Sequence, residues 1–196
     1  GVLEPQVLAQ ELADRFGTVQ ATLHVPAFLP GGRTTVNGEH RLHGQPVHTT
    51  PFAQDRIFGF STSDLSVLLE QKSGGLIRRA GVQRIHLREL DAAGGAGLPC
   101  LIDRLRSLNG NVPVVVDAER QDQLTALAAA VRALRSEKRF LFRSAASLVK
   151  AMADPGPPPL DATGLAGLRR RNSDGGLLPG LVVVGSFVPL ADQQLE

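Results

Sequence analysis

The stretch Leu181–Gln194 reads LVVVGSFVPLADQQ and carries a clear signal of the fold. Four consecutive apolar residues rich in Val are typical of a strand covered on both faces, as in parallel α/β sheets. Such sheets bind ligands where their strands end. Gly185 and Ser186 break the apolar run at that point, so Ser186 is the first place where we expect chemistry.

Three strand-helix units precede this stretch. We expect strands over residues 82–87, 112–116 and 139–142, each leading to a helix, over residues 98–108, 122–134 and 145–152, with Ser144 as the cap of the last one. Repetition of this kind requires parallel strands joined by right-handed crossovers. The sequence therefore predicts an α/β fold, a doubly wound, mostly parallel sheet with helices on both faces.

The amino-terminal third adds a helix, a strand and a hairpin. Apolar residues recur every four positions from Leu8 to Phe16, which predicts an amphipathic helix over residues 3–16 whose apolar face lies on a sheet. Apolar and polar residues alternate over residues 19–25, as in a strand. Asn37-Gly38 is a common hairpin turn because both residues tolerate positive φ, so we expect a small projecting β-hairpin.

Composition sets limits on the function. The chain has 196 residues, 42% of them hydrophobic, and a formal charge of only +2. We expect one main domain, and the scattered basic residues argue against a nucleic-acid partner. The single Cys100 excludes an internal disulfide framework and a Cys-rich metal site, and fits a cytoplasmic location. No apolar run approaches the roughly 20 residues of a membrane span.

Two loops before the strand-helix units carry candidate anion-binding residues. Arg33 follows a Pro- and Gly-rich loop, where its guanidinium could bind a carboxylate or phosphate with two hydrogen bonds; the alternative is an exposed loop arginine. Ser61, Thr62 and Ser63 precede a helix expected over residues 64–72. They could help bind an anion at its amino terminus, and simple helix capping is the alternative.

Asp117 directly follows an apolar strand, a common address for an acidic catalytic or hydrogen-bonding residue. It could equally organise the turn into the next helix. The five histidines show no metal-ligand spacing, and His24 and His86 are expected within strands, packed or paired. Phosphate-binding glycine motifs and a Gly-x-Ser-x-Gly elbow are absent, so no catalytic residue is assigned.

Taken in order, these segments resemble the four-carbon acid sugar kinases. The matching segments are Pro26-Ala27-Phe28, Gly32-Arg33-Thr34, Asn37-Gly38, Pro46-Val47-His48, Ser61-Thr62-Ser63-Asp64-Leu65, Val114-Val115-Val116-Asp117-Ala118, Arg143-Ser144-Ala145-Ala146 and Val182-Val183-Val184-Gly185-Ser186. The family's acidic opening segment, its Asp-Ser-Thr-Leu-Arg-Gly segment and its Gly-rich nucleotide domain have no counterpart here. The chain thus resembles the major part of the family's sugar-binding domain.

The resemblance implies a function and a set of site residues. It implies phosphorylation of threonate, erythronate or oxo-tetronate by ATP with Mg, bound mainly by the absent carboxyl-terminal domain. Substrate-binding residues would be Gly32, Arg33, Ser61, Thr62, Ser63 and Asp117, and Gly185 and Ser186 would lead toward ATP. The partner is then a small sugar acid, with no nucleic acid or membrane; a homo-oligomer stays open. The alternative is a non-catalytic α/β binding module that has lost kinase activity.

The same resemblance suggests how the chain is divided. Residues 1–152 would form the main part of the sugar-binding α/β domain, without its amino-terminal strands. The Pro- and Gly-rich residues 153–180 would be a loop or linker with one short helix near residues 165–169. Residues 181–196 would supply the last strand and the start of the connection to the nucleotide-binding domain.

Overall fold

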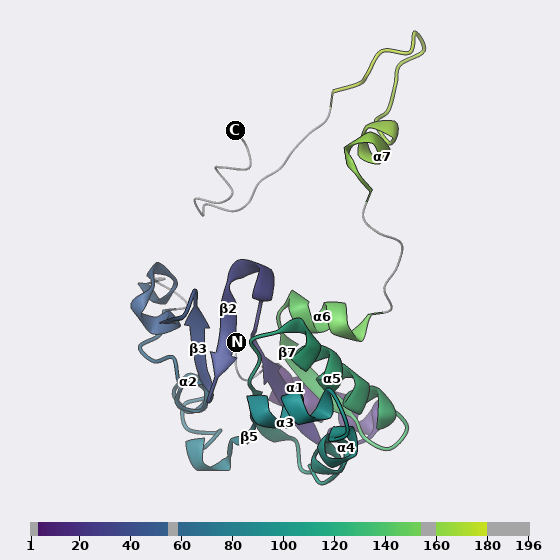
Figure 1. Cartoon of the computed structure of the whole chain (residues 1–196). Coiled ribbons are helices and arrows are strands. Elements are labelled where there is room, and N and C mark those ends of the chain that lie inside the picture. Colours follow the sequence, from purple (N-terminus) through teal and green to yellow (C-terminus); the bar gives the residue numbers. More distant parts are fainter. Residues whose placement is uncertain (1–3, 55–58, 154–159, 180–196) are drawn as a thin grey trace. The chain divides into compact units, whose positions relative to one another are not determined.

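The computed structural model describes residues 4–54, 59–153 and 160–179. The chain divides into two compact units, Gly1–Asp154 and Pro155–Glu196. In the described part of the first unit, a four-stranded sheet has the strand order β5-β6-β1-β7 (Figure 1). Its strands are β1 (Ala21–Val25), β5 (Gln83–Ile85), β6 (Val112–Val116) and β7 (Phe140–Ser144). All neighbouring strands run parallel, so the predicted α/β fold is confirmed.

Helices cover both faces of this sheet. The helices of the first unit are α1 (Glu4–Phe16), α2 (Leu65–Lys72), α3 (Leu87–Ala93), α4 (Leu98–Arg106), α5 (Gln121–Ala133) and α6 (Ala146–Met152). Successive side chains of a strand point to opposite faces. Val114 and Val116 belong to the large core under α3 to α6, whereas Val115 packs with Leu65 and Leu69 of α2.

A small antiparallel ribbon stands beside the sheet. It consists of β2 (Arg33–Val36), β3 (Glu39–Leu42) and the short β4 (Gln45–Pro46), and 3-10 turns occur at residues 29–31, 47–49, 51–54 and 79–81. Asn37 and Gly38 have φ values of 52° and 76°, as a two-residue hairpin turn requires. The predicted hairpin is therefore confirmed.

Several local predictions are wrong. The strand expected to reach residue 87 ends at Ile85, and His86 precedes α3, a helix that we did not predict because its seven residues are too few for a clear period. Ser144 is the last residue of β7 and does not cap α6. The apolar face of α1 is also less covered than expected, since Leu8 and Phe16 are 46% and 57% exposed.

The described part of the second unit contains α7 (Ala162–Gly167), whose amino terminus is capped by Asp161. The predicted strand of residues 181–184, together with Gly185 and Ser186, lies outside the described residues. Among the described helices of both units, none is long and apolar enough to cross a membrane.

Two histidines are buried as neutral side chains. His24, in the middle of β1, is 4% exposed, and its Nδ1 atom has no hydrogen-bond partner. Burial, assisted by the charge of Arg143, lowers the pKa of His24 to about 4. Burial and the charge of Arg33 likewise lower the pKa of His40 on β3 to about 4. The fold therefore disfavours the protonated form of both side chains.

These two histidines predict a loss of stability in mild acid. An unfolded histidine binds its proton as the pH falls through about 6.5, whereas His24 and His40 stay neutral in the folded state down to about 4. The free energy of unfolding should thus fall between these pH values, by on the order of 2–3 kcal/mol per histidine. Urea unfolding at several pH values measures it.

The comparison variant is His24→Leu, which should flatten part of this pH dependence. A free energy of unfolding that does not vary between pH 6.5 and 4 would contradict the burial of neutral histidines.

Candidate functional site

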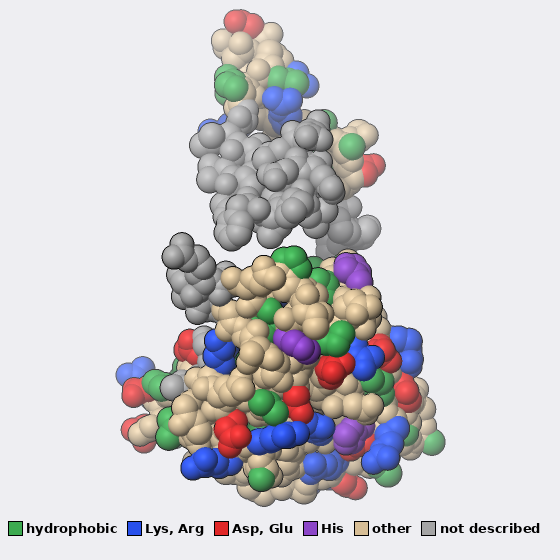
Figure 2. All heavy atoms as spheres, turned by 90° about the vertical axis from the view of Figure 1, so that its left-hand side faces the viewer, with side chains coloured by type: hydrophobic (Ala, Val, Ile, Leu, Met, Phe, Trp, Pro, Cys, Tyr) green, Lys and Arg blue, Asp and Glu red, His purple; other side chains and the backbone are tan. Residues whose placement is uncertain are grey.

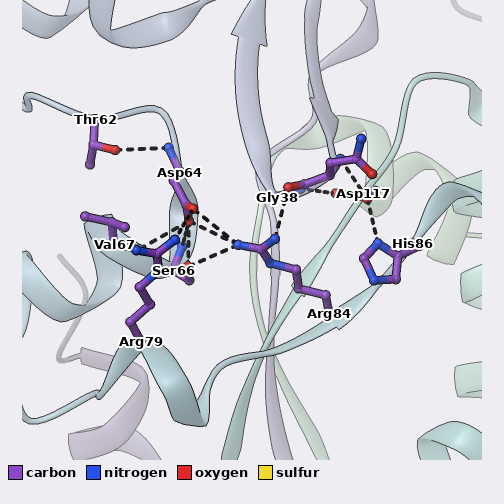
Figure 3. A network of polar contacts seen from close by, with 10 residues as sticks. Gly38, Thr62, Asp64, Ser66, Val67, Arg79, Arg84, His86 and Asp117 are labelled. Atoms are coloured by element: carbon purple, nitrogen blue, oxygen red, sulfur yellow. Dashed lines mark hydrogen bonds and ion pairs between the residues drawn. The ribbon is translucent and has the colours of Figure 1, made fainter.

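The ribbon is attached to the carboxyl edge of the sheet through Asp117. This residue directly follows β6, and its side chain is only 1% exposed. The Gly38 amide donates to Oδ1 at 2.8 Å and the Asn37 amide donates to Oδ2 at 3.0 Å (Figure 3). Thr35 and Ala118 exchange two backbone hydrogen bonds of 2.9 Å. A carboxylate thus holds the positive-φ turn of the ribbon on the sheet.

Burial opposes the negative charge of Asp117, whereas its hydrogen bonds and a nearby histidine favour it. Burial raises the pKa of Asp117 above its usual value, and the two amides and His86 reduce that rise. His86 Nδ1 lies 3.6 Å from Oδ2. Because the pKa is raised, protonation of Asp117 offsets part of the acid destabilisation expected from the buried histidines.

Asp117 does not organise the turn into α5, which was one of its two predicted roles. Gln123 does so, because its Oε1 accepts from the amides of Glu119 and Arg120 at 2.8 and 3.0 Å. The other predicted role, a hydrogen-bonding residue at the end of a strand, fits the contacts with the ribbon. Its assignment to a substrate stays a prediction.

The amino terminus of α2 is occupied by protein groups. Asp64 Oδ1 accepts from the amides of Ser66 and Val67 at 2.8 and 3.3 Å. The Leu65 amide donates to the Gly38 carbonyl, and the Leu68 amide donates to the Asp64 carbonyl. Although burial opposes it, these hydrogen bonds lower the pKa of Asp64. No amide of this first turn is left for an external anion, and the residue that caps α2 is Asp64 rather than Ser61, Thr62 or Ser63.

Arg84 on β5 joins three elements, and sequence reasoning did not identify it. Its Nη2 lies 3.3 Å from both carboxylate oxygens of Asp64 and 3.1 Å from Ser66 Oγ, and its Nη1 donates to the Asn37 carbonyl at 3.2 Å (Figure 3). Arg79 also contacts Asp64, at 3.3 Å. Both guanidinium groups are therefore used within the protein.

Arg33 lies at the base of the ribbon. Its guanidinium carbon is 5.1 Å from the centre of the Phe28 ring, and the two residues exchange backbone hydrogen bonds of 2.9 and 3.0 Å. Gly32 closes this loop with a φ of 67°, and a Cβ atom there would lie 2.3 Å from the His43 ring. Among the described residues, the Arg33 guanidinium has no hydrogen bond or ion pair, so its donors are available to a ligand.

Ser63 lies on the other side of His40 from Arg33. Its Oγ accepts from the His48 amide at 2.9 Å and is 2.8 Å from His48 Nδ1, and its carbonyl accepts from the His40 amide at 2.8 Å. His40 Nδ1 in turn is 3.1 Å from Thr35 Oγ1. We call the side chains of Arg33, Thr35 and His40 the Arg33 cluster.

The structure separates the predicted site residues into two groups. Gly32 and Arg33 belong to the base of the ribbon, whereas Asp117 holds its tip through Asn37 and Gly38. The Ser63 carbonyl accepts from the His40 amide, between the two ends. Ser61 is exposed, and Thr62 Oγ1 accepts from the Asp64 amide at 3.2 Å. Figure 2 shows mixed histidine, basic and acidic side chains on this side of the molecule. Within the described ranges, no cluster of His, Cys, Asp and Glu could hold a metal ion.

The family described as the sugar-binding N-terminal domain matches residues 2–152 of the chain. No curated protein matches its sequence. Its fold is similar to that of a Haemophilus influenzae protein of a family called a domain of unknown function, with a TM-score of 0.55, 19% identity and coverage of 73% of this chain and 32% of the other.

Two further structures show the same fold. A Salmonella typhimurium protein provisionally described as a tRNA synthase has a TM-score of 0.54, 19% identity and coverage of 76% and 32% of the two chains. A Bordetella bronchiseptica protein, a domain-swapped dimer with bound citrate, has a TM-score of 0.51, 22% identity and coverage of 67% and 28%. The chain thus spans about a third of the length of these proteins.

Replacing Asp117 by Asn tests the attachment of the ribbon. An amide side chain has one acceptor oxygen, and its NH2 group would face a backbone N–H that has lost its partner. We expect Asp117→Asn to lower the free energy of unfolding by about 1–3 kcal/mol at pH 7 and to accelerate hydrogen exchange at the Asn37 and Gly38 amides. Urea unfolding and exchange by NMR measure these effects.

Asp122→Asn, at an exposed carboxylate, is the matched control. Equal effects of the two changes would contradict the role of Asp117.

Proposed function

The chain belongs to the family of sugar-binding N-terminal domains, and from this premise we propose that it is the substrate-binding part of an ATP-dependent kinase of four-carbon sugar acids. Membership of the family agrees with the resemblance seen in the sequence and supports a sugar ligand. The acid group, the four-carbon length and the kinase activity belong to the proposal.

The observation that carries the proposal is that the Arg33 guanidinium is free to bind an anion. Arg79 and Arg84 contact Asp64, whereas the guanidinium of Arg33 has no anionic partner among the described residues. The Phe28 ring and the closed loop fix its position. A planar guanidinium held in this way can bind a carboxylate through two parallel hydrogen bonds. Arg33 would therefore bind the carboxylate of threonate, erythronate or a related acid.

The neighbours of Arg33 suit such an anion. His40 is neutral above about pH 4, so it adds no second positive charge beside Arg33. Exposed Ser61 offers a hydroxyl on the segment that leads to the Arg33 cluster. The Bordetella protein with bound citrate provides a related ligand, since citrate is also a hydroxylated carboxylate.

ATP and Mg would have to be bound elsewhere in the protein. The described residues hold no cluster for a metal ion, and Asp64 caps the first turn of α2, so that turn does not offer its amides to a nucleotide phosphate. Gly185 and Ser186, proposed on the ATP side, lie outside the described residues. A kinase of this kind would act in the cytoplasm, where ATP is available.

Calorimetric titration with threonate and with erythronate tests the role of Arg33. Removing a charge-assisted pair of hydrogen bonds costs about 1.5–3 kcal/mol, so Arg33→Ala should weaken binding by about 10- to 100-fold. Arg88→Ala, at an exposed arginine of α3, is the matched control and should bind as the unchanged protein does. Equal affinities of Arg33→Ala and the unchanged protein would overturn the assignment of Arg33, and failure of all three proteins to bind either acid would contradict the substrate class.

A further inference from the structure

Ser63, one of the predicted substrate-binding residues, is held by a histidine that the sequence did not single out. His48 lies in the 3-10 turn of residues 47–49, directly after β4, and is exposed. Its amide donates to Ser63 Oγ at 2.9 Å, and its ring Nδ1 lies 2.8 Å from the same oxygen. Ser63 itself is only 3% exposed. The buried hydroxyl is thus used by the protein, and the exposed group beside it is the imidazole of His48.

The Ser63 hydroxyl determines which ring nitrogen of His48 carries the proton. Ser63 Oγ already accepts the His48 amide, so its own proton needs an acceptor. Among the described residues, His48 Nδ1 is the acceptor within hydrogen-bonding distance, and a buried O–H group without one would cost free energy. Ser63 therefore donates to Nδ1, and the neutral ring carries its proton on Nε2. This leaves a hydrogen-bond donor on the side of the ring away from Ser63.

The segment that carries Ser63 continues the ribbon beyond β3. Glu39 and Asp64 form an antiparallel bridge, and the His40 amide donates to the Ser63 carbonyl at 2.8 Å. Residues opposite one another in such a pairing share a face, and the face alternates along each strand. Ser63 is one position before Asp64, and His40 is one position after Glu39. The side chains of Ser63 and His40 therefore share one face of the ribbon.

The same alternation places Arg33 on this face. Thr35 pairs with His40, and Arg33 lies two positions before Thr35 on β2. Arg33 and Ser63 are thus separated by two strand spacings across the ribbon and two residues along it, roughly 12 Å between Cα atoms. The arginine side chain and a four-carbon acid together span such a distance. A small molecule bound to Arg33 can therefore extend toward His48.

We propose that His48 donates its Nε2–H to a hydroxyl oxygen of the sugar acid whose carboxylate Arg33 binds, and that Ser63 is the positioning residue that fixes the His48 ring and its tautomer. The inference rests on the proposed function and extends it to the hydroxyl end of the substrate. Arg33 recognises the negative charge, whereas a neutral N–H recognises a hydroxyl oxygen beyond C2 without adding charge. The pair would distinguish hydroxylated acids from plain ones.

NMR of the imidazole nitrogens at pH 8 measures the tautomer in the 196-residue chain. We expect His48 to carry its proton on Nε2, and we expect Ser63→Ala to give a mixture of both tautomers because Nδ1 loses its donor. A proton on Nδ1 of His48 in the unchanged protein would overturn the inference, whether or not a sugar acid binds. Should Ser63→Ala not fold, the unchanged protein and the variants of exposed His48 decide.

Calorimetric titration with threonate and with 2-hydroxybutanoate measures the contact itself. The second acid keeps the carboxylate and the C2 hydroxyl but lacks the hydroxyls on C3 and C4. Loss of a neutral hydrogen bond should make His48→Ala bind threonate about three- to tenfold more weakly and leave its affinity for 2-hydroxybutanoate unchanged, whereas Arg33→Ala should weaken both. His48→Gln, which supplies a side-chain N–H, should restore part of the loss. Thr49→Ala, in the same turn, is the matched control and should bind as the unchanged protein does.

The outcomes separate this inference from the proposed function. If Arg33→Ala weakens threonate binding and His48→Ala does not, the role of His48 is overturned and the proposed function stands. An equal loss for both acids in His48→Ala would likewise overturn recognition of a hydroxyl beyond C2. Failure of the unchanged protein to bind threonate and erythronate would contradict the proposed function and this inference together.

Discussion

The buried carboxylate of Asp117 is the interaction on which the candidate site depends. It accepts the Gly38 and Asn37 amides at 2.8 and 3.0 Å and so holds a turn of two positive-φ residues on the end of β6. The ribbon carries Arg33 at its other end, so the position of that guanidinium follows from how the turn is attached. Arg84 reinforces the attachment from β5.

Two arginines near the ribbon, Arg79 and Arg84, form ion pairs within the protein, whereas Arg33 forms none with the described residues. Asp64 caps α2 and contacts both Arg79 and Arg84, which gives the carboxylate two roles at once. Arg33 instead lies on an aromatic ring and next to His40, whose pKa of about 4 keeps it neutral. Within the described ranges this positive charge has no counterion, so its donors are available to a ligand.

The two edge strands of the described sheet differ in length and in the side chains that lie beside them. β5 has three residues and carries Arg84, whose side chain is tied to α2 and the ribbon. β7 has five residues, and a groove lined by apolar and basic side chains runs along it. Side-chain contacts thus cover the β5 edge, whereas the described residues leave a groove beside β7.

The sequence by itself determined the local periodicity: the β6 strand, α1 and α5 within a residue, and the Asn37-Gly38 turn. These features depend on neighbours in the chain, whose spacing is visible in a sequence. Only the tertiary structure decided that Asp117 pairs with a turn about 80 residues away and that Arg84 joins α2 to the ribbon. It also decided that Arg33 has no counterion among the residues that the structure describes. Such partners depend on how strands are ordered and crossed in space, and no local pattern records that order.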